Sequence, residues 1–256
     1  RVQTEDGYEV KATLWHDFYT QRGKIKLRDL VSGDHLLIQS DKGQFGNQGS
    51  LELGVLLGLI AGDGHFANRG RGQKAAVVNF WGEDRVLAPA IAAYINTLTA
   101  GLSFSSRAYR AEPVAVPTRN HVFVRSVLLA RFLQHLGFSA ETKYRVPEIV
   151  WKGSEDCVRG YLRGLFQADG TINVSGYGQS CSIRLASSRL ELLKDVQVVL
   201  ANWGIICRIY LRRNARKTLL PNGRGGQSVY QCSADYELII DGESRERFMR
   251  EIGFVV

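Results

Sequence analysis

Two acidic residues, Asp63 and Asp169, each stand near the end of a copy of one nine-residue pattern. Residues 56–64 read Leu-Leu-Gly-Leu-Ile-Ala-Gly-Asp-Gly and residues 162–170 read Leu-Arg-Gly-Leu-Phe-Gln-Ala-Asp-Gly, so both fit L-x-G-L-x-x-x-D-G. Carboxylates beside the free carbonyls of helix ends form a cluster of hard oxygens, which suits Mg²⁺. Paired carboxylates that hold divalent metals are one way to cut phosphodiesters in line.

The residues before each acid predict a helix, beginning after the N-cap Ser50 in the first copy and near Ser154 in the second. Glycine inside a helix costs up to about 1 kcal/mol relative to alanine, so its repetition requires a reason. Close approach of two helix backbones is such a reason, and it would bring both acids to one end of the contact. We expect each acid in the last turn of its helix, where the helix dipole disfavours a carboxylate. The small residues recur at every fourth position: Gly54, Gly58, Gly62, Gly160, Gly164 and Ala168.

The two copies resemble the paired LAGLIDADG motifs of monomeric homing endonucleases, a family that cuts long, specific sites in double-stranded DNA. The resemblance covers roughly residues 50–256 and implies an α+β fold, in which two pseudo-symmetric αββαββα halves form a DNA-binding saddle. It also implies Mg²⁺ at Asp63 and Asp169 with the neighbouring backbone of Gly62 and Ala168. By the same resemblance Mn²⁺ substitutes and Ca²⁺ supports binding without cleavage. The protein would act as a monomer on a long asymmetric site, cut across the minor groove and leave short 3′ overhangs.

The repeat extends beyond the motifs, because residues 131–138 match residues 247–254. Each half then reads as a motif helix, a hairpin, a helix, a second hairpin and a closing helix. The hairpins are expected at about 65–81 and 102–125 in the first half and at 171–187 and 205–241 in the second; the middle helices at 84–99 and 188–202. The second half is longer by about ten residues, which we place in the stretch Asn214–Gln227.

Alternation along the second-half strands predicts one core face and one polar, basic face able to read base edges in the major groove. Ile172 and Val174 are expected in the core, as are Ile183, Leu185 and Leu211. No acidic residue occurs between Val196 and Ala234, which favours a nucleic-acid surface there. The predicted DNA contacts are Arg69, Arg71, Lys74, Asn79, Arg107, Tyr109, Arg119, Asn173, Ser175, Tyr177, Ser182, Arg184, Arg208, Tyr210, Arg212, Arg213, Arg216, Lys217 and Arg224.

Lys143, in the segment after the first closing helix, resembles the family lysine whose ammonium lies near the scissile phosphates. The resemblance makes Lys143 a candidate catalytic residue beside Asp63 and Asp169. Its ammonium would position the attacking water or stabilise the charge that develops during the reaction. The alternative is an ordinary surface lysine. Its counterpart in the second half would fall beyond residue 256. His65 is a weaker candidate, because Thr171 occupies the matching place.

The first 41 residues differ in character and predict short strands interrupted by glycines. Thr13 and His16 resemble the T-x-x-H block of intein splicing domains, which implies a remnant of such a domain without its nucleophile. The alternative is an ordinary small β segment. We therefore divide the chain into a splicing-type segment (1–41), a polar Gly-rich linker (42–50), a first half (51–150) and a second half (151–256).

The composition narrows the class of protein. The net charge is +8 and 45% of the residues are hydrophobic, which indicates a chain with a real core and an acidic partner. The four cysteines are widely spaced, and no signal peptide or long apolar run is present, so we expect an intracellular protein, in the cytoplasm or nucleoid, without a membrane partner. Two alternatives remain open: an RNA-intron maturase, and a catalytically inactive sequence-specific DNA-binding protein.

Overall fold

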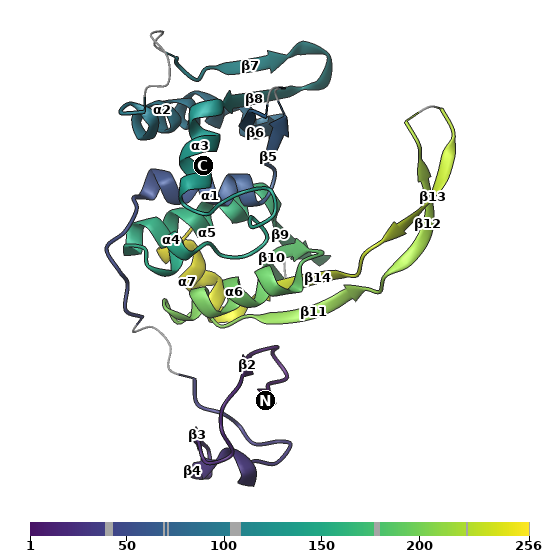
Figure 1. Cartoon of the computed structure of the whole chain (residues 1–256). Coiled ribbons are helices and arrows are strands. Elements are labelled where there is room, and N and C mark those ends of the chain that lie inside the picture. Colours follow the sequence, from purple (N-terminus) through teal and green to yellow (C-terminus); the bar gives the residue numbers. More distant parts are fainter. Residues whose placement is uncertain are drawn as a thin grey trace. The chain divides into compact units, whose positions relative to one another are not determined.

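The computed structural model describes residues 1–38, 43–68, 70, 72–102, 109–176, 180–223 and 225–255. The chain forms two compact units, each built from two stretches of sequence. Figure 1 shows the helices and strands, coloured in chain order. One unit contains both motif helices and the whole first half, in residues Phe45–Asn173 and Phe248–Val256. The other contains residues Arg1–Gln44 and Val174–Arg247.

The first half has the order αββαββα, as predicted, and its strands form an antiparallel sheet in the order β5-β6-β8-β7. The middle helix starts later than expected, because a 3-10 turn (η2, Gly82–Leu87) precedes it and Pro89 lies in its first turn. The elements are α1 (Leu51–Ala61), β5 (His65–Asn68), β6 (Lys74–Trp81), α2 (Ala88–Thr99), β7 (Pro113–Val116), η3 (Pro117–Arg119), β8 (His121–Ser126) and α3 (Val127–His135), followed by the short helix α4 (Glu148–Trp151).

The second half repeats this order of elements and the same strand arrangement, β9-β10-β14-β11. The predicted α+β fold class is therefore confirmed. The extra residues form an ordered two-stranded ribbon, β12 paired with β13, inserted between β11 and β14. The elements are α5 (Glu155–Asp169), β9 (Gly170–Ser175), β10 (Ser180–Ser187), α6 (Leu190–Ala201), β11 (Arg208–Arg213), β12 (Arg216–Pro221), β13 (Gln227–Cys232), β14 (Asp235–Ile240) and α7 (Gly242–Glu251).

The two motif helices, α1 and α5, run parallel and touch along their backbones. A Cβ atom placed on Gly58 would lie 2.2 Å from the carbonyl oxygen of Tyr161, and one on Gly164 would lie 2.3 Å from that of Val55. Gly54 and Gly160 are blocked in the same way by backbone oxygens of the opposite helix. Each glycine therefore makes room for the other helix, which is the reason that the sequence pattern required.

Serine side chains fix where the main helices of this unit begin. The hydroxyl of Ser50 accepts a hydrogen bond from the Leu53 backbone N–H, and Ser154 accepts one from Cys157. Ser126 caps α3 in the same way. These caps satisfy amide donors that have no partner inside a helix, and those at Ser50 and Ser154 were predicted from the sequence.

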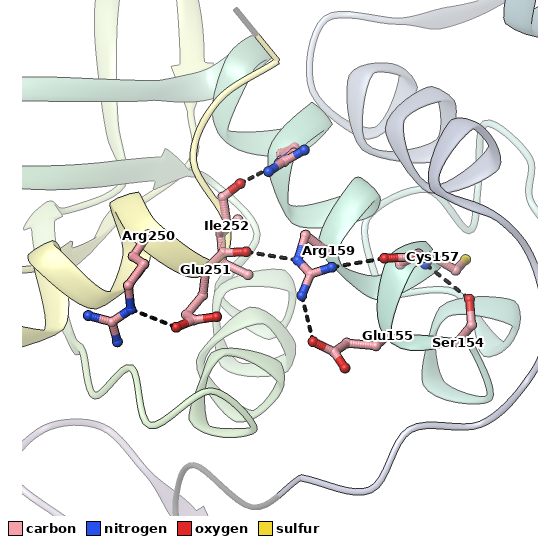
Figure 2. A network of polar contacts seen from close by, with 9 residues as sticks. Ser154, Glu155, Cys157, Arg159, Arg250, Glu251 and Ile252 are labelled. Atoms are coloured by element: carbon pink, nitrogen blue, oxygen red, sulfur yellow. Dashed lines mark hydrogen bonds and ion pairs between the residues drawn. The ribbon is translucent and has the colours of Figure 1, made fainter.

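The last turn of α7 is fastened to α5 by arginine side chains, as Figure 2 shows. The Arg159 guanidinium donates to the carbonyl oxygen of Glu251 at 2.8 Å and to the Glu155 carboxylate at 2.5 Å. Arg163, one turn later on α5, donates to the carbonyl oxygen of Ile252. Cationic groups at the carbonyl end of a helix satisfy orphan acceptors and complement the helix dipole.

The alternation predicted for the second-half sheet is correct for its central strands and wrong for its edge. Ile183 and Leu185 are each 1% exposed, as expected of core residues. Ile172 and Val174 are 50% and 63% exposed, because β9 is an edge strand and α6 packs against β10, β11 and β14. Leu211, near the end of β11, is also exposed, which contradicts its predicted core position.

The N-terminal segment contains two small antiparallel pairs, β1 (Val2–Gln3) with β2 (Glu9–Val10) and β3 (Asp17–Thr20) with β4 (Gly23–Lys26), followed by the 3-10 turn η1 (Leu27–Asp29). Its first residues pack on α6 and β11 within the same compact unit. The Ile209 N–H donates to the Asp6 carbonyl oxygen at 3.1 Å, at the free edge of β11. The buried Gln197 amide donates to the same oxygen at 2.8 Å and to the Cys207 carbonyl oxygen at 2.9 Å.

The helix lengths and the cysteines were also considered in the sequence analysis. Within the described parts of the chain, no helix is both long and apolar enough to span a membrane. The four cysteines are unpaired, with Cys157 and Cys207 buried and the other two half-buried.

We predict that Gly58→Ala destabilises the protein by about 3 kcal/mol or more, since its methyl group would overlap the backbone of α5, which has no side chain to move away. The free energy of unfolding in urea measures this effect. Gly101→Ala is the matched control, because no atom lies within 4 Å of a Cβ at that position. Equal stabilities of the two variants would contradict the backbone contact.

We predict that Gln197→Met lowers the free energy of unfolding by about 1–3 kcal/mol, because the carbonyl oxygens of Asp6 and Cys207 lose their shared donor. Hydrogen exchange should also show faster exchange of the Ile209 amide. Val198→Ala, at the neighbouring exposed position, should change stability by less than about 0.5 kcal/mol. Unchanged stability and exchange in the Gln197 variant would show that the N-terminal residues are not held there.

Candidate active site

The parallel helix contact brings both motif acids to one end of the α1–α5 pair. Asp169 is the last residue of α5, as predicted, whereas α1 ends at Ala61 and Asp63 follows in the adjoining turn rather than in the last helical turn. A Cβ atom at Gly62 would lie 2.5 Å from that of Ala168 and 3.1 Å from the Asp169 carboxylate oxygen Oδ2. Glycine at position 62 is therefore what allows the second acid to reach the end of the first helix.

The environment of the acids disfavours their charged forms. The pKa of Asp169 is raised to about 6, mainly by desolvation and in addition by the nearby Asp63 carboxylate. Desolvation also raises the pKa of Asp63, with a further contribution from Asp84. Lys143 opposes both shifts. Acids held close together against their own repulsion are a common feature of functional sites.

Lys143 is buried at the same helix end and is not a surface lysine. Its ammonium donates to the carbonyl oxygens of Gly64 at 2.8 Å, Ile60 at 3.2 Å and Gly62 at 3.4 Å. Burial lowers the pKa of Lys143, while the Asp169 and Asp63 carboxylates act in the opposite direction. The ammonium thus uses all three donors on carbonyl oxygens at the end of α1 and in the turn that follows it, and it supplies positive charge beside the acids.

Asn79, expected to contact DNA, is instead tied to the first motif. Its amide nitrogen donates to the Asp63 carbonyl oxygen at 2.8 Å and lies 3.2 Å from His65 Nδ1. Its amide oxygen lies 3.1 Å from His121 Nε2, and the His121 ring stacks on Trp81 with 4.0 Å between ring centroids. His65 therefore lies in this network beside Asp63, where desolvation and Lys143 both lower its pKa.

A third carboxylate, Asp84, lies close to Asp63 and was not foreseen from the sequence. Gln167, within the second motif, donates to Asp84 Oδ1 at 2.8 Å and accepts a hydrogen bond from the Val255 N–H at 3.0 Å. The matching position in the first motif is Ala61. This difference between otherwise similar motifs was the signal in the sequence that the two halves of the site are not equivalent.

The structure places the predicted DNA contacts in four different situations. Arg69, Arg71, Arg107, Tyr177 and Arg224 lie outside the described residues. Some of the others already have partners inside the protein: Arg184 pairs with Glu237 at 3.1 Å, Arg208 with Asp6 at 2.9 Å, and Arg212 and Arg213 share Asp235 at 3.4 Å. Ser182 is buried, which makes it a poor DNA contact. The exposed members include Tyr109, Arg119, Tyr210, Arg216 and Lys217.

The donor set of this site fits a hard divalent cation. In the described part of the chain, no three His, Cys, Asp or Glu side chains converge to form a metal-binding group. Mg²⁺ does not require such a group, because it is usually held by one or two carboxylates and keeps several waters. A cation between Asp63 and Asp169 would also offset the desolvation and the repulsion that together raise the pKa of Asp169.

Sequence comparisons relate the chain to segments of larger proteins. Residues 156–253 match the model of the LAGLIDADG-like domain. The chain is 33% identical over 262 residues to the ribonucleoside-diphosphate reductase NrdEB subunit alpha of Bacillus subtilis, covering 97% of this chain and 24% of that protein. It is 25% identical over 269 residues to the replicative DNA helicase DnaB of Rhodothermus marinus, covering all of this chain and 26% of that protein. The chain thus spans about a quarter of the length of these relatives.

Structural comparison agrees with the family match. The chain resembles mesophilic variants of the homing endonuclease I-DmoI, with 20% identity, a TM-score of 0.51, and coverage of 79% of this chain and 88% of that one. A variant of I-DmoI in complex with nicked target DNA and manganese gives 21% identity, a TM-score of 0.53, and coverage of 79% and 95%. The protein is therefore an α+β chain with two αββαββα halves joined through their motif helices. It carries a LAGLIDADG-like domain and has the LAGLIDADG homing endonuclease fold.

We predict that Asp169→Asn stabilises the metal-free protein at neutral pH. The folded-state pKa of Asp169 is raised, so its ionisation destabilises the fold increasingly as the pH rises from about 4 through about 6. Allowing for solvent screening at this exposed side chain, the gain at pH 7.5 is about 1 kcal/mol and disappears near pH 4. Urea unfolding at both pH values, in EDTA, measures the gain.

Glu83→Gln, at an exposed carboxylate in the 3-10 turn η2, is the control for a generic effect of removing negative charge. Added Mg²⁺ should raise the melting temperature of the wild type more than that of the Asp169 variant, because a ligand stabilises only the state that binds it. A pH-independent difference between the wild type and the Asp169 variant would contradict the raised pKa of Asp169.

Proposed function

We propose that the chain is a site-specific double-strand DNA endonuclease that depends on Mg²⁺. The observation that carries the proposal is the placement of Asp63, Asp169 and buried Lys143 at one end of two helices in backbone contact. The likeness to I-DmoI, whose complex with DNA and manganese has this fold, supports it. The enzyme acts inside the cell, in the cytoplasm or nucleoid, as a monomer on a long asymmetric duplex site.

Each residue has a distinct part in the proposed reaction. Asp63 and Asp169 would hold the divalent ion, whose contribution when bound would be positive charge beside the scissile phosphate and the attacking water. The Lys143 ammonium places positive charge beside the two carboxylates and fixes the backbone at residues 60–64 through its three hydrogen bonds. Asn79 holds the Asp63 backbone in place. Hydrolysis across the minor groove would leave short 3′ overhangs, as in the family that the chain resembles.

We also propose that the chain is part of an intein. The relatives that match nearly its whole length include a reductase, a helicase and the replication factor C small subunit of Methanocaldococcus jannaschii, of which it covers 24%, 26% and 12%. A segment shared by proteins with such different names is best explained as a portable insertion. The resemblance of Thr13 and His16 to the T-x-x-H block supports the same proposal. In the structure these two residues belong to one turn, in which the His16 backbone N–H donates to the Thr13 carbonyl oxygen at 3.0 Å.

The two alternative functions, an RNA-intron maturase and a catalytically inactive DNA-binding protein, make different predictions. An RNA-intron maturase would prefer structured RNA, whereas strands that enter a major groove suit B-form DNA, because the A-form groove is deep and narrow. A DNA-binding protein without catalytic activity would not require the acids, yet both acids are present and kept at an energetic cost.

The test is cleavage-site selection on randomised duplex DNA with Mg²⁺, followed by kinetics on the selected duplex. We predict that Asp63→Asn and Asp169→Asn each lower the cleavage rate by at least about 100-fold, the range expected when a catalytic group is lost. Specific binding in Ca²⁺ should persist, because the amide keeps the size of the side chain. Asp156→Asn, at the opposite end of α5, is the matched control and should cleave normally. Full cleavage by either motif variant would refute the metal-site assignment.

A further inference from the structure

The ribbon formed by β12 and β13 is present only in the second half. In the first half, the corresponding strands β7 and β8 are joined by the short 3-10 turn η3 and Asn120, whose φ of 45° closes the connection. In the second half, β11 and β14 lead instead into six further cross-strand pairs, from Arg216 opposite Cys232 to Pro221 opposite Gln227. Six residues of strand span about 20 Å.

The ribbon is exposed on both faces. Leu219 and Val229 lie opposite each other on one face and are 60% and 64% exposed. Leu220 and Tyr230, on the other face, are 42% and 40% exposed. Figure 1 shows the ribbon as a long, curved continuation of β11 and β14. A register shift between Leu211 and Arg213 marks the point where the ribbon leaves the sheet, as expected because such irregularities bend strands.

A two-stranded ribbon of this kind is only marginally stable in water by itself, so its length suggests a bound partner. Its charge indicates the chemistry of that partner. Arg212, Arg213, Arg216 and Lys217 cluster at its base, and Asp235 is the only acidic residue from position 196 to 235. Asp235 is already shared by Arg212 and Arg213. The base of the ribbon therefore carries a net positive charge, which suits a polyanion.

The distribution of side chains favours DNA over a membrane or a second copy of the chain. Apolar residues occur on both faces, so neither face forms a continuous apolar surface for lipid or for self-association. Each face instead mixes aliphatic groups with hydrogen-bonding groups, such as Thr218 beside Tyr230 and Lys217 beside Gln231. This mixture is suited to base edges and thymine methyl groups, and the major groove of B-DNA admits a two-stranded ribbon.

We propose that the β12–β13 ribbon binds the major groove of the target duplex beyond the base pairs read by the second-half sheet, so that the protein covers unequal lengths of DNA on the two sides of the cut. Arg216 and Lys217 bind phosphates, and the side chains toward the tip contact base edges. This inference rests on the proposed function, because it assumes a duplex DNA target.

The experiment compares the wild type with a ribbon-less variant in which an Asn-Gly turn joins Asn214 to Ala234, and with the double variant Arg216→Ala/Lys217→Ala. Hydroxyl-radical footprinting in Ca²⁺, on a duplex selected from randomised DNA by binding of the wild type in Ca²⁺, should show protection that is shorter by about six base pairs on one side for the ribbon-less protein. Protection on the other side should not change. The double variant should reduce the slope of log affinity against log salt by about 2, one for each phosphate contact.

Arg28→Ala/Lys24→Ala, with exposed charges in the N-terminal segment, is the control for a general loss of positive charge. An unchanged footprint for the ribbon-less protein, or an unchanged salt slope for the double variant, would overturn the proposal. A shortening on both sides would also overturn it. Failure of the wild type to cut any duplex would refute the endonuclease function, whereas the footprint reports on the ribbon without cleavage.

Discussion

The parallel backbone contact between α1 and α5 is the interaction on which the rest of the structure depends. Parallel packing aligns the two helix dipoles and gathers their negative ends, and the motifs add Asp63 and Asp169 at the same place. Electrostatics alone would separate these groups. The close fit of glycine against backbone, visible at Gly58 and Gly164, holds them together, and Lys143 supplies compensating charge. The site thus stores an unfavourable interaction that a divalent cation would relieve.

Much of this arrangement could be predicted from the sequence, because repeated patterns report local structure and mutual contact. The glycine spacing predicted the helix contact, and the duplicated motif predicted two similar halves. The errors have a common cause: sequence alternation does not show which strand lies at an edge. Ile172 and Val174 follow the alternation of a core strand but lie on β9, beyond the cover of α6. The sequence also does not show contacts between residues that are far apart along the chain. Asn79 was therefore predicted to contact DNA, and the burial of Lys143 was not predicted.

The N-terminal segment illustrates how a buried polar group can link parts of a chain that differ in character. The composition of residues 1–41 suggests a separate module, yet Gln197, only 1% exposed on α6, donates to the backbone of Asp6. A buried amide without hydrogen-bond partners would cost free energy. Gln197 on α6 and the edge of β11 therefore depend on the N-terminal residues for a hydrogen-bond acceptor. Asp6 also pairs with Arg208, so the same contact neutralises one predicted DNA-binding cation.

The interlocking of α1 with α5 also limits how this chain can grow during evolution. A residue inserted into either motif helix would rotate every later glycine away from the facing backbone and place side chains where no space exists. Insertions can therefore survive only far from the helix contact, in connections between strands. The β11–β14 connection has accepted one, and the β7–β8 connection has not. A chain with a rigid centre and extendable hairpins can acquire new surface while the geometry around Asp63 and Asp169 stays constant.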